Sequence, residues 1–295
     1  MSRRFHIVDV FAEAPLEGNQ LAVVRDAGDL GTAAMQGLAR EFGFSETTFV
    51  VSDPRAFEAG VRVRIFTPAE ELPFAGHPTL GSAWVIREHL AGQRVDAVAL
   101  ELGVGRVPVR FEAEAGGPEV AWLAAPPIEL GARVPAARIA PVLGLGPEDL
   151  DPALPVQHVL AGIGFLFVPL RSLDAVRRGR LDLHAFEPLA REGLPAQIYL
   201  FCREALEETN DLHARMLFAA PDVREDPATG SATACLGAYL LAHRAFGTGP
   251  LSLRIEQGIE MKRPSLLRLR ASDAAGEPQI EVGGRVIETA RGELL

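Results

Sequence analysis

The sequence predicts an α+β protein of two pseudo-symmetric domains, each a mostly antiparallel sheet around a central helix. One observation is the length of 295 residues, which suggests two domains at roughly 150 residues per domain. Another is an internal repeat: residues 38–41 recur at 189–192 and 64–68 at 215–219, both 151 positions on, and 77–83 recur at 226–232, 149 positions on. Matches in the same order indicate a duplicated domain. Coincidence among common Ala, Leu and Gly residues is the competing explanation.

The third observation is that the predicted elements follow a similar order in the two halves. Apolar runs and alternation predict strands at residues 5–11, 21–24, 47–51, 61–66, 107–111, 165–168, 198–202 and 214–219. Helical periodicity predicts helices over residues 31–42, 78–89, 173–178 and 229–243. The Gly-, Ala- and Pro-rich segment 112–127 is the expected crossover. The expected domains are 1–120 and 121–295, with the last strand able to return to the first domain.

Composition narrows the functional class. The formal net charge of −10 argues against a nucleic-acid partner. The longest apolar stretch, residues 159–170, is shorter than the ~20 residues of a membrane span. Cys202 and Cys235 are too few for a disulfide framework, and Asp9 precedes any apolar run of signal-peptide length. Lys262 is the single lysine, so Schiff-base chemistry has one candidate. A soluble, cytoplasmic protein is expected.

Two strand–turn–helix motifs, residues 75–79 and 226–231, are candidate anion sites. A helix N-terminus offers unpaired N–H groups and a partial positive charge, which suit a carboxylate. His77 and Asp226 occupy matching places in the repeat. If the halves face each other, we expect the two helix N-termini to converge on one cleft that binds a small anionic substrate and stabilises a developing negative charge.

Glycines strengthen this interpretation, because Gly76 and Gly230 let the backbone approach a ligand closely. A structural alternative exists for each motif. Asp226 and Thr79 are also typical helix N-caps, each stabilising by about 1 kcal/mol. His77 taken alone is typical of a buried structural histidine.

Glu46 is the candidate base. It lies between Phe44 and Phe49 at the start of a predicted strand, where desolvation favours the protonated form and makes the carboxylate a better base near neutral pH. The repeat places Gln197 opposite Glu46, so the halves differ in chemistry at this point. A solvated glutamate at a strand end is the alternative.

Other chemistries lack support in the sequence. The seven histidines lie far apart without metal-ligand spacing, so no metal site is predicted. Phosphate and dinucleotide loops are not recognisable, and no cofactor is expected. Cys202 and Cys235 are interpreted as small core residues.

The motifs together resemble the PhzF family, which is of the phenazine-biosynthesis isomerase type. The resemblance covers nearly the whole chain and rests on Val8-Asp9-Val10-Phe11, Gly18-Asn19-Gln20-Leu21-Ala22-Val23, Phe44-Ser45-Glu46-Thr47, Phe66-Thr67-Pro68, Phe74-Ala75-Gly76-His77-Pro78-Thr79, Glu225-Asp226-Pro227-Ala228-Thr229-Gly230-Ser231-Ala232 and Arg263-Pro264-Ser265. It implies the diaminopimelate-epimerase fold, independence of cofactors and a homodimer.

The resemblance also implies roles for individual residues. Glu46 resembles the catalytic acid/base, and His77 and Asp226 resemble groups that hold substrate and assist proton movement. The implied substrate-binding residues are Asn19, Gly76, Thr229, Gly230 and Ser231. Two departures are Lys262, where the family pattern has glycine, and Gln20, where proline is frequent.

The expected reaction is a proton shift on a small carboxylate. The prototype substrate implied by the resemblance is trans-2,3-dihydro-3-hydroxyanthranilate, with Glu46 moving the proton. Two alternatives stay open. One is a racemase or epimerase without catalytic cysteines, with Asp226 as the second base; the other is a non-catalytic carboxylate-binding protein that retains the fold.

Overall fold

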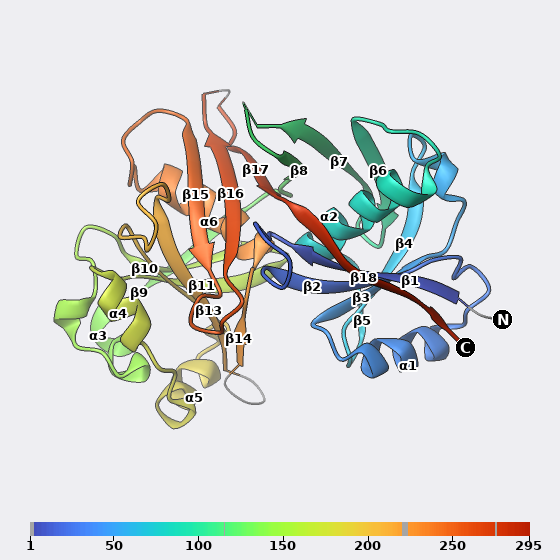
Figure 1. Ribbon diagram of the computed structural model, residues 1–295. Coiled ribbons are helices and arrows are strands. Elements are labelled where there is room, and N and C mark those ends of the chain that lie inside the picture. Colours follow the sequence, from blue (N-terminus) through green and yellow to red (C-terminus); the bar gives the residue numbers. More distant parts are fainter. Residues whose placement is uncertain (1–2, 115, 220–223, 275) are drawn as a thin grey trace. The chain divides into compact units, whose positions relative to one another are not determined.

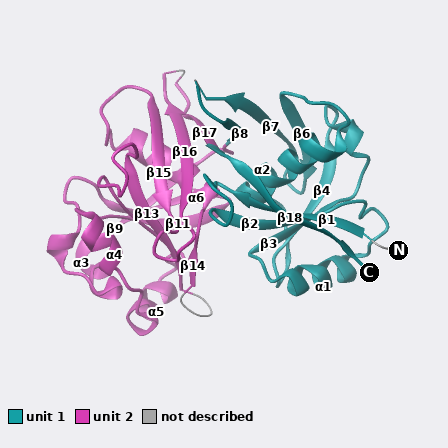
Figure 2. Ribbon diagram, in the orientation of Figure 1, with its two compact units in different colours: residues 1–124, 283–295 teal, residues 125–282 magenta. Residues whose placement is uncertain are grey.

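The computed structural model (Figure 1) describes residues 3–114, 116–219, 224–274 and 276–295. It forms two compact units, shown in teal and magenta in Figure 2. Unit 1 comprises residues 1–124 and 283–295, and unit 2 comprises residues 125–282. Both combine sheet and helix, which confirms the predicted α+β class.

Unit 1 consists of strands around one helix, with a second helix outside (Figure 1). Its elements are β1 (Arg3–Val10), β2 (Asn19–Val24), α1 (Thr32–Phe42), β3 (Glu46–Val50), β4 (Val61–Phe66), β5 (Glu71–Leu72), α2 (Gly76–Val85), β6 (Ala97–Leu102), β7 (Gly105–Ala113), β8 (Glu119–Ala124) and β18 (Val286–Leu294). A π-helical turn, Ile86–Leu90, continues α2. Strand β18 pairs antiparallel with β1, so the chain ends in unit 1.

Helix α2 is the central helix of unit 1. It contacts β1, β2, β3, β6, β7, β8 and β18, and nearly all of its residues are buried. A helix that is buried on every side must lack charges, and the sequence of α2 has none. Gly81 brings it close to the sheet, since a Cβ there would lie 2.6 Å from Leu21 Cδ2. Helix α1 covers the other face of the sheet of unit 1, where Met35 packs with Phe49.

Unit 2 has the same plan. Its elements are β9 (Glu129–Val134), α3 (Ala136–Ile139), β10 (Val156–Ala161), β11 (Ile163–Pro169), α4 (Leu173–Arg178), α5 (Leu183–Arg191), β12 (Gln197–Cys202), β13 (Leu212–Phe218), β14 (Arg224–Asp226), α6 (Gly230–Ala242), β15 (Leu251–Gln257) and β16 (Ser265–Ser272). Strand β17 (Gln279–Gly284) carries the chain from unit 2 back to unit 1. Helix α6 is the buried helix and contacts β10, β11 and β16.

The strand pairing demonstrates the duplication. In unit 1, β2–β3 is parallel, β3–β4 and β4–β5 are antiparallel, β4–β6 is parallel and β6–β7 is antiparallel. In unit 2, β11–β12, β12–β13, β13–β14, β13–β15 and β15–β16 follow the same order of directions. The register agrees as well, because Thr47 pairs with Phe66, and Ile198 pairs with Leu217 at the 151-residue offset.

A repeated ion pair closes the same strand pair in each unit. Arg64 donates from Nε and Nη2 to the Glu71 carboxylate at 2.7 and 2.6 Å. Arg215 donates from the same atoms to Glu225 at 2.9 and 2.8 Å. Both pairs are bidentate, which fixes geometry as well as charge.

Some expectations need correction. The segment 112–127 is not merely a crossover, because β8 lies within it and pairs antiparallel with β7. The helix expected to continue regularly through His89 changes to the π-helical turn after Val85. The helix α5 was not expected, because it is short and contains Pro188.

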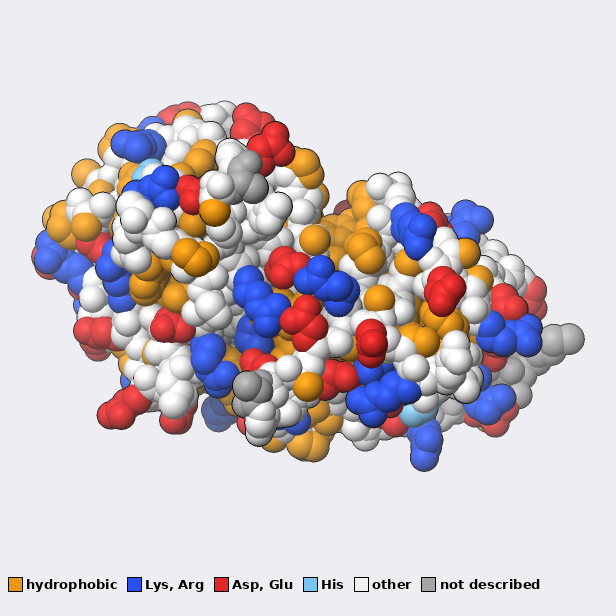
Figure 3. All heavy atoms as spheres, turned by 90° about the horizontal axis from the view of Figure 1, so that it is seen from above, with side chains coloured by type: hydrophobic (Ala, Val, Ile, Leu, Met, Phe, Trp, Pro, Cys, Tyr) orange, Lys and Arg blue, Asp and Glu red, His pale blue; other side chains and the backbone are white. Residues whose placement is uncertain are grey.

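Among the described residues, no helix is long and apolar enough to cross a membrane. Figure 3 shows acidic and basic side chains side by side on the face seen from above.

Candidate functional site

A hydrogen bond between β3 and α2 sets the geometry of the site in unit 1. The Ser82 hydroxyl donates to Thr48 Oγ1 at 2.8 Å, and both side chains are buried. Side chains two residues apart in a strand share a face, so Glu46 lies on the same face of β3 as Thr48, toward α2. His77 lies in the first turn of that helix.

Glu46 and His77 meet at this point. His77 Nε2 lies 3.4 Å from Glu46 Oε2, and the side chains are 8% and 16% exposed. Glu46 therefore lies partly buried at the start of its strand, not as a solvated strand end. The structure thus brings together two of the three residues predicted to be catalytic.

Burial keeps His77 neutral. It lowers the pKa of His77 to about 3, against a hydrogen bond with the backbone of Gln20 that raises it. Among the described residues Nε2 has no hydrogen-bond partner, so the ring uses Nδ1 toward the Gln20 carbonyl. A proton on Nδ1 leaves the lone pair of Nε2 facing Glu46. The pair can therefore receive and hold a proton.

The first turn of α2 leaves backbone donors available. Ala75 is the N-cap residue and its side chain makes no capping bond. The N–H groups of Gly76 and His77 precede the first helical hydrogen bond, which runs from Thr79 N to the Ala75 carbonyl. Thr79 is not a cap, because its hydroxyl donates to that same carbonyl at 2.7 Å. Asn19, which is 2% exposed, begins the neighbouring strand β2.

Asp226 is the corresponding acidic residue of unit 2. The Thr229 hydroxyl donates to Asp226 Oδ2 at 2.5 Å. Gln257 Nε2 donates to Thr229 Oγ1 at 3.0 Å and to the Asp226 carbonyl at 2.8 Å. Gln257 is fully buried, so this chain of hydrogen bonds holds the carboxylate in one orientation. Sequence reasoning missed Gln257, which lies in no motif.

The start of α6 corrects one sequence inference. His77 is the second residue of α2, whereas Asp226 ends β14 and precedes α6 by a short loop. The two do not occupy equivalent places; Ser231 is the second residue of α6. Asp226 is also no N-cap, since Thr229 holds that position. Helix α6 begins later after the strands of its unit than α2 does in unit 1. The sequence match could not reveal this difference.

The asymmetry predicted at Glu46 agrees with the fold. Tyr199 is hydrogen-bonded to Thr233, which corresponds by the 151-residue offset to the bond between Thr48 and Ser82. Gln197 precedes Tyr199 by two residues, as Glu46 precedes Thr48. An amide therefore stands in unit 2 where unit 1 has its carboxylate.

The turn from Gly258 to Arg263 supports the Asp226 loop. A Cβ on Gly258 would lie 2.6 Å from the Pro227 carbonyl oxygen, so only glycine fits there. Lys262 has a φ of 60° in the same turn, the left-handed region that favours glycine. The departure from the family pattern is thus accommodated with backbone strain.

The cysteines lie in the core. Cys202 is in β12 and Cys235 is inside α6, and both are almost fully buried. Burial raises the pKa of each thiol to about 12. Neither is poised as a nucleophile or base.

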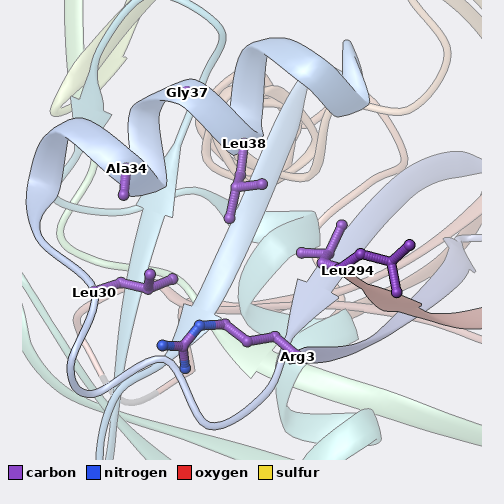
Figure 4. Close-up of a pocket in the computed structure, with 7 residues that line it drawn as sticks. Arg3, Leu30, Ala34, Gly37, Leu38 and Leu294 are labelled. Carbon is purple, nitrogen blue, oxygen red and sulfur yellow. The ribbon is translucent and has the colours of Figure 1, made fainter. Parts of the chain in front are cut away.

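A hollow of about 470 Å³ lies beside α1 in unit 1, lined by Arg3, Leu30, Ala34, Gly37, Leu38, Leu294 and Leu295 (Figure 4). Its charged group, Arg3, is bonded to Asp29 at 2.7 Å. None of the predicted site residues, all of which are described, lines it. The hollow is therefore separate from the candidate chemistry.

The predicted site residues fall in both units. Glu46, His77, Gly76 and Asn19 belong to unit 1, and Asp226, Thr229, Gly230 and Ser231 belong to unit 2. That both groups serve one substrate stays a prediction.

Known proteins identify the family. The sequence profile described as phenazine biosynthesis-like protein matches residues 8–292. An uncharacterized isomerase of Mesorhizobium japonicum is 37% identical, covering 100% of this chain and 99% of its own. A trans-2,3-dihydro-3-hydroxyanthranilate isomerase of Pseudomonas chlororaphis is 34% identical, covering 98% of each chain. A PhzF-family phenazine biosynthesis protein of Bacillus anthracis has a TM-score of 0.87 at 27% identity, covering 100% of this chain and 99% of its own. The chain belongs to the PhzF family, and it is an isomerase.

Proposed function

We propose that the protein moves a proton between two carbons of a small unsaturated carboxylate, as in trans-2,3-dihydro-3-hydroxyanthranilate or a related compound. The observation that carries the proposal is the partly buried Glu46 carboxylate, 3.4 Å from the neutral His77 imidazole at the start of α2. The name of the Pseudomonas chlororaphis relative supports this substrate class.

The first step breaks a carbon–hydrogen bond. A Glu46 oxygen takes the proton from a carbon α or vinylogous to the carboxylate, and the electron pair is delocalised toward that carboxylate. The Glu46 carboxyl then donates a hydrogen bond to the lone pair of His77 Nε2, which holds the proton in place. In the second step the Glu46 carboxyl, whose proton exchanges with solvent in part of the turnovers, donates a proton to another carbon, and Glu46 is a carboxylate again. Positioned proton transfer of this kind contributes about 10²–10⁴-fold in rate.

Backbone groups stabilise the charge that develops between the two steps. The N–H groups of Gly76 and His77 begin α2 and carry the positive end of its dipole. We assign the substrate carboxylate or the enolate-like oxygen to this end. Asp226, oriented by Thr229 and Gln257, is the second polar group assigned to substrate.

The test is proton NMR in D2O with small unsaturated amino and hydroxy acids, headed by dihydro-hydroxyanthranilate. Wild type is compared with Glu46→Gln, and Glu41→Gln is the matched control because Glu41 is exposed on α1. We expect deuterium to enter a ring or α carbon with wild type and control but not with Glu46→Gln.

Other outcomes separate the alternatives. Deuterium exchange with inversion at one carbon, abolished by Asp226→Asn, would show an epimerase. Ligand-induced thermal shifts that are equal in wild type and Glu46→Gln, without deuterium uptake, would show a binding protein. Either result overturns the isomerisation proposed here.

We also propose a homodimer that works without a cofactor, as the family resemblance implies, and a cytoplasmic location, as the composition suggests. Size-exclusion chromatography with light scattering measures the mass of the assembly. Activity after dialysis against a metal chelator measures the cofactor requirement.

A further inference from the structure

Three side chains with metal-binding atoms meet in unit 1, apart from Glu46 and His77. His6 comes from β1, His89 from the π-helical turn after α2, and Glu288 from β18. One ligand atom from each lies within 4.8 Å of the others. The three are far apart in the sequence, so spacing could not reveal the cluster.

The contacts within this cluster are short. His6 Nδ1 lies 2.7 Å from Glu288 Oε1, and His89 Nε2 lies 3.4 Å from Glu288 Oε2. The two imidazole rings stack with centroids 4.5 Å apart and planes 15° apart. A tetrahedral Zn²⁺ with bonds of about 2.1 Å holds ligand atoms about 3.4 Å apart, which matches the separation of His89 Nε2 and Glu288 Oε2. His6 Nδ1 would give up its contact with Glu288 Oε1 and turn toward the ion.

Hydrogen bonding within the cluster is incomplete. Among the described residues, the Nε2 atoms of His6 and His89 are buried and have no hydrogen-bond partner. His89 Nε2 is the unpaired atom that faces Glu288, 3.4 Å from Oε2. A metal ion beside this carboxylate would take the lone pair of that nitrogen and offset its desolvation cost.

Irregular backbone carries two of the three side chains. The β1–β18 register shifts between Ile7, opposite Ala290, and Val8, opposite Glu288, so Thr289 is an extra residue in β18. Such bulges re-aim neighbouring side chains. The π-helical turn that carries His89 is a rare conformation often found at functional sites.

Two neighbouring charges act on a cation in this cluster. The positive Arg25 opposes it, and the Glu288 carboxylate offsets Arg25.

We propose that His6, His89 and Glu288 bind one divalent transition-metal ion, with Zn²⁺ as the best match to two imidazoles and one carboxylate. The side chains of His89 and Glu288 are 24% and 23% exposed, which leaves a path for the ion and a position for a water ligand. The ion would connect β1, β18 and the end of α2, and so stabilise unit 1. It is not assigned to proton transfer.

The test is calorimetric titration of the full chain, stripped with chelator, with Zn²⁺ near neutral pH. We expect one ion per chain in wild type. His89→Gln and Glu288→Gln should each weaken the affinity about tenfold or more. His184→Gln is the matched control, because His184 is exposed in α5 of unit 2, and its affinity should equal that of wild type.

Heat stability and spectra complete the experiment. Zn²⁺ should raise the Tm of wild type but not of His89→Gln, and Mg²⁺ should raise neither, because imidazole is a poor ligand for it. Co²⁺ should give visible absorption of a four-coordinate site. Circular dichroism of each variant establishes that it is folded. The proposal is wrong if wild type does not bind one Zn²⁺ saturably, or if both variants bind it like wild type.

Discussion

The neutral state of His77 governs how the reaction should depend on pH. Burial lowers the pKa of His77 to about 3, far below its ordinary value of 6.5. The ring therefore stays neutral through the pH range in which most histidines ionise. We expect a profile of kcat/KM against pH without an inflection near 6.5 that belongs to this residue.

Comparison of wild type and His77→Leu over that range checks this expectation. The variant should lose about 10- to 100-fold in rate, because leucine has no acceptor to hold the proton on Glu46. Its pH profile should keep the wild-type shape. An inflection near 6.5 that disappears only in the variant would show that His77 titrates during turnover.

Lys262 carries strain that glycine would remove. Its φ of 60° is costly for a residue with a Cβ, by roughly 1–2 kcal/mol, and its side chain is exposed. We expect Lys262→Gly to raise the free energy of unfolding by about 1 kcal/mol, measured in urea. Lys262→Ala keeps the Cβ and should give no such gain. Equal effects of the two substitutions would assign the change to the lost charge instead.

At the scale of elements, one hydrogen bond fixes α2 against β3. Ser82→Ala leaves the fully buried Thr48 hydroxyl without its donor, at a cost of about 1–3 kcal/mol in the free energy of unfolding. Thr48→Val removes the other partner. In a double-mutant cycle we expect the summed costs of the two single substitutions, in free energy of unfolding, to exceed the cost of the double substitution. Strict additivity would mean that the bond does not couple the elements.

The elements that sequence reasoning located best have a clean apolar pattern. Residues 61–66 were predicted as the strand that is observed as β4, and residues 173–178 as the helix observed as α4. Strand β8 was missed because it follows a Gly- and Pro-rich stretch whose composition resembles a loop. Rules of composition and periodicity describe a segment by itself. Strand β8 forms because it pairs with β7, a contact that these rules do not consider.

The whole molecule shows why the site was only partly predictable. Glu46 and His77 lie in recognisable motifs, so residue type and position in the sequence indicate their chemistry. Gln257 orients Asp226 from a different strand and carries no motif of its own. The cluster of His6, His89 and Glu288 likewise arises when β1, β18 and the end of α2 come together. The positions of such residues depend on which distant segments pair, and the spacing of residues in the sequence does not predict that pairing.

Two buried histidines should give the whole chain a stability maximum near pH 6.5. The folded pKa of His77 is depressed, so its contribution is complete above 6.5 and is lost as pH falls toward 3. The pKa of His213 is raised: burial lowers it, but the hydrogen bonds to Glu256 and Glu260 and the charges of these carboxylates together outweigh burial. Its contribution is therefore complete below 6.5 and is lost as pH rises.

The alkaline side of this maximum isolates His213, since its bonds to Glu256 at 3.0 Å and Glu260 at 3.1 Å are strongest when the ring is charged. Above pH 6.5 the free energy of unfolding should fall by up to about 1.4 kcal/mol per pH unit until the folded pKa is passed. Urea unfolding of wild type and His213→Gln at several pH values measures the slope. The variant should be less stable and should lack this slope, because it has lost the titrating ring. Glu256 keeps its bonds from Leu206, Glu207 and Asn210 in the variant. A wild-type stability that stays level from pH 6.5 to about 8, or a slope that survives in His213→Gln, would place the titrating group elsewhere.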